Sequence, residues 1–467
     1  MKACLIIIRR AAVITALIVP SLMAAAQSPN AEKNDTSFTP RPSDKGRLTF
    51  HARSFLMSTI NEGKTKDYAA WAAGAGLKYE TREIKNFKAA AGAYFIFNVR
   101  SSDLVSPDSI SGTKNRYETG LFDITDPGNK YNILRLEELY LQYRIHHSFV
   151  TVGRQLLKTP FINPQDGRMR PGFEEGIWFD IKERNDLTIN AGWLWKMSPR
   201  SVTGWYSAGK SIGLYPPGVD GNGKPSLYKD NTKSNGIGIL GIVYKKNYWG
   251  IQAWDTWVEN IMNTALLQTE FNFTVGKKEK IITGLQFTIQ HGAGRGGNAD
   301  SSKRYYPEGS KSFVISGKLG YSGNRWETNL NYTRISSDGR FLMPREWGRE
   351  PFYTFMLRER NEGFGDVNAV TAAFLYHIKD KGWDFSLAYG HFYLPDVKNY
   401  WLNKYGMPSY NQLNAGVNKK FNKKLRGLSF QLLFTCKGQL GDTYNNPKFI
   451  ANKVDMLNSS LIVNYQF

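Results

Sequence analysis

The sequence predicts an all-β protein: a transmembrane antiparallel β-barrel of eighteen strands whose extracellular loops fold inward. Three observations predict this fold. Segments of about ten residues with alternating apolar and polar side chains recur along the chain, short charged links alternate with longer ones, and the chain ends on an alternating strand that closes with Phe467. A transmembrane strand needs roughly 9 to 11 tilted residues, with apolar side chains toward lipid and polar ones toward the lumen.

The chain begins with the layout of a secretory signal peptide. Lys2, Arg9 and Arg10 precede an apolar run, and three alanines ending at Ala26 provide a small-residue cleavage site. We therefore expect residues 1–26 to be a signal peptide, residues 27–45 a flexible periplasmic lead-in and residues 46–467 the barrel domain. An exported barrel of this kind belongs in the bacterial outer membrane of a Gram-negative cell.

Eighteen segments alternate or are rich in β-forming residues, an even number as bacterial single-chain barrels require. The segments are Leu48–Ser58, Tyr68–Tyr79, Phe87–Val99, Ile133–Ile145, Phe149–Leu156, Gly176–Lys182, Leu187–Lys196, Gly236–Lys245, Tyr248–Val258, Leu266–Val275, Ile281–His291, Phe313–Tyr321, Trp326–Ile335, Val370–Ile378, Trp383–Phe392, Gln412–Lys420, Leu428–Lys437 and Asp455–Phe467. The last must pair with the first, because an open edge in lipid would leave backbone groups without partners.

The links between these segments support the same fold. Short charged links, such as 246–247 and 379–382, alternate with mostly long ones, such as 197–235. Short periplasmic turns and longer outer loops are typical of a barrel, and this parity places both termini in the periplasm. One segment departs from strict alternation: its parity shifts at Glu137 and Glu138, which indicates a bulge.

The composition fits a barrel with a wet lumen and does not fit a helical membrane protein. The mean hydropathy is −0.43, and no apolar run after the signal region approaches the roughly 18 residues that a membrane helix requires. Aromatic residues are nevertheless abundant, with 25 Tyr, 27 Phe and 12 Trp, as the two interfacial girdles of a barrel demand. The formal net charge of +21 would suggest a nucleic-acid partner in a cytosolic protein, but the signal peptide argues against one.

The charge and the motifs narrow the class of function. We expect the positive charge to contact acidic lipid headgroups, or to make an electropositive pore that draws in anions. No HExxH, paired-cysteine or G-x-S-x-G arrangement accompanies the six histidines. The sequence therefore predicts neither catalysis nor a bound cofactor or metal.

The third outer link, Leu157–Glu175, is the most informative loop. It carries Lys158, Arg168 and Arg170 together with Asp166. In porin-like barrels a loop folded into the lumen narrows the channel, and its charges select what passes. Arginine suits a carboxylate because its planar fork donates two parallel hydrogen bonds. We expect this loop to constrict the lumen; the alternative is a solvated surface loop with local ion pairs.

The seventh outer link, Ser336–Ala369, is unusually rich in charges of both signs. We assign Arg340, Arg345 and Arg349 to the constriction, and aromatic residues such as Trp347 are interleaved with them. Nearly balanced charge with interleaved aromatics is not the composition of a disordered loop. The loop therefore folds over or into the pore as a selective element, or it forms a salt-bridged lid without selectivity.

Two short motifs resemble the OprD family of substrate-selective outer-membrane porins, in a divergent form such as Bacteroidetes-type bacteria carry. Residues 71–81 (WAAGAGLKYET) resemble the family's second-strand pattern, and residues 166–173 (DGRMRPGF) resemble its third-loop D-x-R-x-x-P element. The resemblance runs over the whole mature chain. It implies an eighteen-stranded barrel and passive uptake of amino acids, small peptides or carboxylates, while some related channels pass chito-oligosaccharides.

The resemblance also implies where the eyelet lies. In the family, the third and seventh loops and a ladder of arginines on the inner wall build it. Asp166 and Arg168 fall in the matching third-loop element. Lys196 and Lys318 are turned inward by strand parity and are candidate wall positions, whereas Arg154 has the parity of its apolar neighbours and would need a bulge to face inward.

We therefore expect a porin for passive diffusion of small carboxylate-bearing nutrients. Arg168 and Arg170 would bind a carboxylate transiently, and Asp166 would hold an arginine or meet a substrate ammonium. A rival hypothesis is a channel for oligosaccharides, and a less favoured one is an outer-membrane barrel enzyme. The sugar channel predicts aromatic stacking along the path from Trp347, Trp401 or Tyr400.

The expected partners are outer-membrane lipid, lipopolysaccharide and small-molecule solutes. Resemblance to other outer-membrane barrels implies that Phe467 is the signal read by the outer-membrane assembly machinery. We expect a monomer or a weak trimer.

Overall fold

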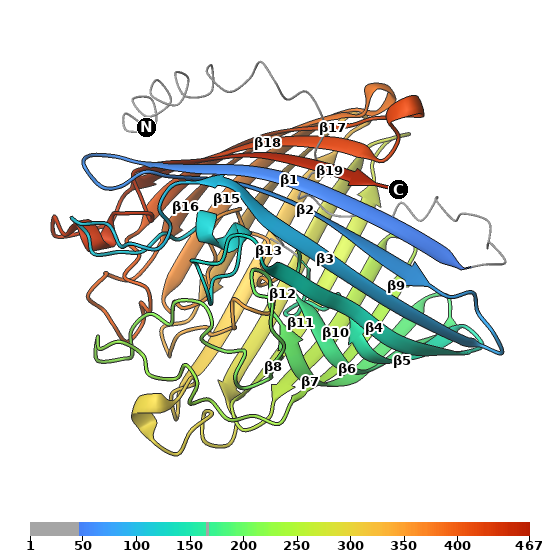
Figure 1. Cartoon of the computed structure of the whole chain (residues 1–467), viewed down its shortest axis with the longest axis horizontal. Coiled ribbons are helices and arrows are strands. Elements are labelled where there is room, and N and C mark those ends of the chain that lie inside the picture. Colours follow the sequence, from blue (N-terminus) through green and yellow to red (C-terminus); the bar gives the residue numbers. More distant parts are fainter. Residues whose placement is uncertain (1–45, 165–167) are drawn as a thin grey trace.

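The computed structural model describes residues 46–164 and 168–467, which form a closed antiparallel β-barrel (Figure 1). The predicted signal peptide, the lead-in and Asp166 lie outside the described residues. Figure 1 shows the long loops gathered at one end of the barrel and the short turns at the other, beside the C-terminus. Since longer loops are extracellular and short turns periplasmic, the described part of the chain begins and ends at the periplasmic side.

Nineteen strands are hydrogen-bonded in one sheet, and eighteen of them form the wall, because β8 has only two residues and pairs with the end of β7. The strands are β1 Arg47–Asn61, β2 Tyr68–Glu80, β3 Phe87–Ser101, β4 Ile133–Ile145, β5 Ser148–Gln155, β6 Phe173–Arg184, β7 Leu187–Ser198, β8 Tyr206–Ser207, β9 Ile237–Lys246, β10 Trp249–Val258, β11 Met262–Thr274, β12 Lys280–Gly292, β13 Lys311–Ser322, β14 Trp326–Ile335, β15 Val367–Ile378, β16 Trp383–Tyr393, β17 Tyr410–Lys420, β18 Leu428–Gln439 and β19 Met456–Gln466.

Helical structure in the described residues is confined to single turns of 3₁₀ helix in the links. These are η2 Glu118–Leu121, η3 Ser301–Lys303, η4 Lys379–Lys381, η5 Lys423–Leu425 and η6 Pro447–Phe449. Within residues 46–164 and 168–467, a helix of the length and apolarity needed to cross a bilayer does not occur.

Each predicted strand corresponds to one wall strand, and the predicted eighteen-stranded barrel is confirmed. The predicted closure is also confirmed, since β19 pairs with β1 from Met456 opposite Asn61 to Gln466 opposite His51. Several strands are longer than predicted; β6, for example, begins at Phe173. The sequence did not predict β8, because two residues carry no periodic pattern.

The two faces of the wall differ as the alternation predicts. On β12 the side chains of Leu285 and Ile289 are exposed on the outer face, whereas Gln286 and Gln290, each the next residue along the strand, are buried toward the lumen. The same division holds on β13, where Leu319 is exposed outside. Apolar side chains therefore face the membrane all along these strands, and amides and hydroxyls face the interior.

The predicted irregularity in β4 is a bulge. The register between β3 and β4 shifts so that Gly92 pairs with Glu138 and Ala93 with Leu136, which leaves Glu137 as the extra residue. Because a bulge resets the alternation, Glu137 and Glu138 both turn away from the membrane, and each meets a basic partner inside. The bulge therefore places two carboxylates in the lumen within one strand.

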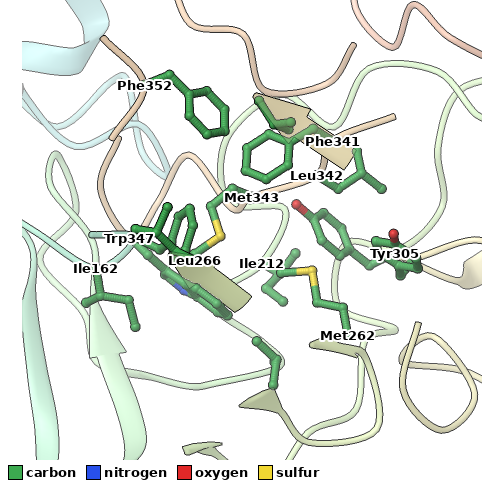
Figure 2. Close-up of a cluster of buried hydrophobic side chains, with 14 of the residues drawn as sticks. Ile162, Ile212, Met262, Leu266, Tyr305, Phe341, Leu342, Met343, Trp347 and Phe352 are labelled. Carbon is green, nitrogen blue, oxygen red and sulfur yellow. The ribbon is translucent and has the colours of Figure 1, made fainter. Parts of the chain in front are cut away.

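The extracellular loops fill much of the lumen with an apolar cluster. We name the loops by position: L3 is 156–172, L4 is 199–236, L6 is 293–310, L7 is 336–366 and L8 is 394–409. Figure 2 shows Phe341, Leu342, Met343, Trp347 and Phe352 of L7 meeting Ile162 of L3, Ile212 of L4, Tyr305 of L6 and Met262 and Leu266 of β11. Full burial of a large apolar side chain stabilises a fold by roughly 1.5–3 kcal/mol. The cluster therefore holds these loops in a defined position inside the lumen.

Candidate constriction of the lumen

L3 reaches the inner wall through Arg170. The Arg170 Nε lies 2.8 Å from Glu137 Oε2 on β4, its Nη1 lies 2.8 Å from His51 Nδ1 on β1, and its guanidinium stacks 4.5 Å from the ring centre of Tyr94 on β3. Burial alone would disfavour the charged form, but Glu137 outweighs it and raises the pKa of Arg170 above the ordinary value. Arg170 is therefore a fixed positive charge, with 19% of its side chain exposed.

Two further arginines converge on the same place. Arg135 Nη2 donates to Glu137 Oε1 at 2.8 Å and to the Pro171 carbonyl at 2.7 Å. Arg53 donates from Nη1 to the Arg168 carbonyl and from Nε to Asn464 at 2.6 Å. A cavity of about 10 Å³, room for about one water molecule, lies beside Arg135 and Arg170. Two guanidinium groups thus share the Glu137 carboxylate and a third, that of Arg53, binds the L3 backbone beside them, which leaves a surplus of positive charge where L3 meets the wall.

L7 crosses the lumen and is held on its far side by a buried carboxylate. Glu359 Oε1 lies 2.8 Å from Arg116 Nη2, and its Oε2 lies 3.0 Å from Lys437 Nζ on β18. Burial by itself would raise the pKa of Glu359, but Arg116, Lys437 and Arg345 together lower it to about 2. Beside it, Arg358 donates to Asn458 and Ser460 of β19, both at 2.7 Å. These contacts fix L7 to the wall.

Two of the predicted L7 arginines serve contacts between loops. Arg345 donates to Glu362 at 2.6 Å and stacks on Tyr405 of L8 at 4.0 Å. Arg340 donates to the Val219 and Asp220 carbonyls of L4 at 2.9 and 3.0 Å. Both side chains are therefore engaged at the extracellular side of the lumen and join L7 to its neighbours.

Arg349 lies where L3 and L7 meet. Asn163 of L3 donates to the Arg349 carbonyl at 2.9 Å and accepts its backbone N–H at 3.2 Å. The guanidinium stacks 4.2 Å from the ring centre of Phe355, and both side chains are partly exposed. These two bonds from the Asn163 side-chain amide to the Arg349 backbone fix one loop against the other, so Arg349 marks the L3–L7 junction as a candidate part of the eyelet.

The two lysines predicted to line the inner wall point in different directions. Lys318 faces the lumen: its Nζ lies 3.3 Å from Glu270 on β11 and 4.7 Å from the ring centre of Tyr353 of L7. Lys196 does not, and its predicted inward orientation is wrong. A bulge at Trp195 shifts the β6–β7 register so that Lys196 opposes Glu175, which in turn opposes Arg154.

Paired residues share a face of the sheet, and on this face Arg154 has the parity of Val152, which is exposed to the membrane. Lys196 and Arg154 both contact Glu175, at 3.5 and 2.9 Å, and Arg154 stacks on Trp205 at 4.5 Å. The bulge therefore turns Lys196 to the outside, and the expectation that Arg154 faces outward agrees with the structure.

The remaining L3 residues occupy different positions. Lys158 is exposed, whereas Arg168 is buried and lies at positive φ, with its backbone carbonyl held by Arg53. Asp166 lies outside the described residues. The charged side chains of L3 therefore do not form one group. Among those described, Arg170 is the side chain that contacts Glu137 on the inner wall.

Sequence reasoning missed Arg53, Arg135 and Glu359. The parity shift at Glu137 pointed to a carboxylate in the lumen, but nothing in the local sequence shows that Arg170 of L3 binds it or that Arg53 of β1 lies beside them. Among residues 46–164 and 168–467, no cluster of three or more His, Cys, Asp or Glu side chains has the geometry to hold a metal ion.

The comparisons with known proteins decide the family. The family model described as "outer membrane porin, OprD family" matches residues 109–353, more than half of the chain. The chain belongs to the OprD family of outer membrane porins. Its fold and family are those of channels located in the bacterial outer membrane. No curated protein sequence matches the chain.

Solved structures show the same barrel at low sequence identity. Pseudomonas aeruginosa OpdK, crystallised with vanillate, has a TM-score of 0.69 and 15% identity over 90% of this chain and 98% of OpdK. Acinetobacter baumannii OccAB3 has a TM-score of 0.70, also with 15% identity, 90% and 98% coverage. Pseudomonas aeruginosa OccK9 (OpdG) has a TM-score of 0.70 and 13% identity over 90% of this chain and 97% of OccK9. These OprD-like structures confirm the fold.

Proposed function

We propose that this OprD-family porin conducts small water-soluble nutrients by passive diffusion and favours solutes that carry a carboxylate, such as amino acids, small peptides or organic acids. One observation carries the preference: Arg53, Arg135 and Arg170 gather where L3 contacts the inner wall, and Arg135 and Arg170 share one carboxylate, that of Glu137. Near this patch the electrostatic potential is positive, so an anion is attracted and a cation repelled.

The partial exposure of Arg170 lets a solute reach this charge. A carboxylate can accept two parallel hydrogen bonds from a guanidinium such as that of Arg170. Because Glu137 already holds part of Arg170, the solute bond stays weak enough to break, as conduction requires. The OpdK structure with vanillate, an aromatic carboxylate, agrees with this class of solute.

The rival hypothesis, an oligosaccharide channel, proposed three aromatic residues that stack on sugar rings, and one of them is buried. Trp347 is 1% exposed, packs within the apolar cluster and donates its indole N–H to Ser211 at 2.8 Å. It is therefore unavailable for stacking on a sugar ring. Trp401 remains exposed, but it lies in L8 on the extracellular side and does not by itself define a path.

The test is the reversal potential of single barrels in a planar bilayer under a salt gradient. Arg170→Gln removes one lumenal charge, and since a unit charge at about 4 Å in water contributes roughly 1 kcal/mol, the anion-to-cation permeability ratio should fall about fivefold. Lys196→Gln is the matched control, because it removes the same charge from the outer surface. Liposome swelling with amino acids, organic acids and sugars should show the same order of preference.

A clearly cation-selective unmodified channel would refute the carboxylate preference. Equal shifts in the two variants would show that the overall charge of the protein, and not the L3 patch, sets the selectivity.

A further inference from the structure

An apolar groove lies on the outer wall of the barrel, facing the membrane. It has a volume of about 320 Å³ and is lined by Phe374, Phe385 and Leu387 on one side, Ala415 and Val417 at its base, and Leu432 and Phe434 on the other. Phe374, Phe385 and Leu387 are exposed on the outer face. The groove exists because β17 presents small side chains between the bulky ones of β16 and β18, its two neighbours in the sheet.

A basic cluster stands at the periplasmic end of this groove. Ala415, Val417 and Lys419 lie on the same face of β17, and Lys419 is two residues closer to the turn, roughly 7 Å along the strand. The Lys419 ammonium lies 5.0 Å from the ring centre of Trp383 and 5.3 Å from that of Phe421. Trp and Tyr rings mark the membrane–water interface in barrels, so Lys419 is placed at the level of lipid headgroups.

The turn that follows adds four more cations and no carboxylate. Residues 419–429 contain Lys419, Lys420, Lys423, Lys424 and Arg426, and all but Lys419 are largely exposed. Leu425, between them, has half of its surface exposed. An apolar side chain among cations at a membrane surface is suited to enter the interface beside acidic headgroups.

The surplus charge is confined to one side of the periplasmic rim. Counting each turn with two residues on either side, the five turns from β9 to β18 carry 13 Lys and Arg against 4 Asp and Glu. The three turns from β2 to β7 carry 5 against 4, and there Lys88 pairs with Glu80 and Arg184 with Asp186. Nine positive charges of the first arc therefore have no compensating carboxylate in their own turns.

We propose that the groove over β16–β18 and the basic turn 419–429 form a binding site for an anionic phospholipid of the periplasmic leaflet. One acyl chain lies against Ala415 and Val417, and the headgroup phosphate contacts Lys419 and its neighbours in the turn. Lipid fits better than an acidic protein, because the cations adjoin a membrane-facing apolar groove at the interface. Each Lys or Arg near an anionic surface strengthens binding about fivefold.

The site is tested by lipid retention. The purified folded barrel is exchanged into detergent with equal amounts of phosphatidylglycerol and phosphatidylcholine, and bound lipid is measured by native mass spectrometry. The unmodified protein should retain phosphatidylglycerol selectively. Replacing Lys419, Lys420, Lys423 and Lys424 by Gln should abolish the preference, at least a tenfold change in the ratio, and Ala415→Phe should reduce retention of both lipids by filling the groove.

The control replaces four cations on the opposite arc, Arg82, Lys85, Arg144 and Arg184, by Gln, and it should keep the preference. Unmodified conductance in a bilayer shows that each variant is folded. The proposal would be overturned if the unmodified protein retained the two lipids equally. It would also be overturned if the substitutions on the two arcs reduced the phosphatidylglycerol preference equally. Full displacement by soluble glycerol phosphate at the same concentration would also overturn it, because the site would then bind an anion and not a lipid. None of these outcomes depends on the selectivity of the lumen.

Discussion

The two ends of the barrel use charge in opposite ways. Counting each link with two flanking residues, the extracellular loops carry 29 Lys and Arg against 23 Asp and Glu, whereas the periplasmic turns carry 18 against 8. Many loop charges are buried and paired, as Glu359 is with Arg116 and Lys437. The cations of the turns from β9 to β18 are exposed, with the sole exception of Lys419, which is half-buried.

The difference follows from the surroundings of each end. Inside the lumen, the loops remove charges from water, and an uncompensated buried charge is expensive, so nearly every cation must find a carboxylate or several carbonyl groups. At the turn end, water and headgroups solvate the ammonium groups, and a one-sided surplus is tolerated. Charge at the loop end therefore determines how the loops dock, while charge at the turn end is available to an external partner.

Removing a carboxylate that neutralises buried cations at the loop end should have the largest effect on the docking of the loops. Glu359→Gln leaves the buried Lys437 and the partly exposed Arg116 with no full counter-charge, and removal of one partner of a buried pair costs about 3–5 kcal/mol. L7 should detach from β18 and β19 while the barrel itself stays folded. The measurement is the rate of protease cleavage within L7, together with the frequency of large current fluctuations in a bilayer.

The matched control for that variant is Glu308→Gln. Glu308 pairs with Arg304 in L6, but its side chain is 81% exposed, so its loss should leave L7 unaffected. If both variants release L7 equally, the buried carboxylate is not what holds the loop.

Acid should have the next largest effect at the loop end. The pKa of Glu359 is lowered to about 2 from an ordinary value near 4.5, so its contribution is fully present above pH 4.5 and is lost as the pH falls toward 2. The loss amounts to about 3 kcal/mol, at 1.36 kcal/mol per pKa unit. Current fluctuations from L7 should therefore increase as the pH falls from 4.5 toward 2.

Two other L7 carboxylates act in the opposite direction. Burial raises the pKa of Glu346 and of Glu350, so protonation of either one on acidification favours the docked loop. The comparison with Glu359→Gln, which lacks the Glu359 titration and keeps the other two, isolates the contribution of Glu359. If the variant shows the same increase in fluctuations as the unmodified channel, another group controls the acid response.

Neutralising a compensated lumenal cation should have the smallest effect. Lys318 and Glu270 form an ion pair with no net charge. Lys318→Met leaves the negative charge of Glu270 in the lumen, where Tyr353 still donates a hydrogen bond to it. Because the Glu270 carboxylate lies beside the open lumen and is screened by water, the permeability ratio should change by less than about twofold. Reversal potentials measured beside Arg170→Gln provide the comparison. A larger shift for Lys318→Met would place the selective charge on the β13 wall and not at L3.

Strand periodicity predicted the barrel well but predicted single side-chain orientations unevenly. The parity shift at Glu137 and Glu138 was visible in the sequence, because two adjacent carboxylates cannot both lie on a strictly alternating inner face. The bulge at Trp195 was not visible, since tryptophan suits either face near an interface. This one extra residue was enough to turn the Lys196 side chain from the predicted inner face to the outer face.

The loop arginines show a second kind of limit. The composition of L7 predicted a folded, charged loop, and the structure places it across the lumen. Composition could not predict which neighbour each arginine would contact: Arg340 binds carbonyls of L4, whereas Arg349 stacks on Phe355 at the L3 junction. Such choices depend on contacts between segments far apart in the chain.

The sequence by itself determined the number of strands, the direction each face points over regular stretches, and which end carries loops and which carries turns. These follow from local rules: a period of two, the length of a membrane-spanning strand and the need to leave no edge in lipid. Only the tertiary structure decided which charges meet, as where Arg170 of L3 binds Glu137 of β4 beside Arg53 of β1, and where small side chains open a groove over β17. Packing and pairing between distant segments set both features, and no local pattern in the chain encodes them.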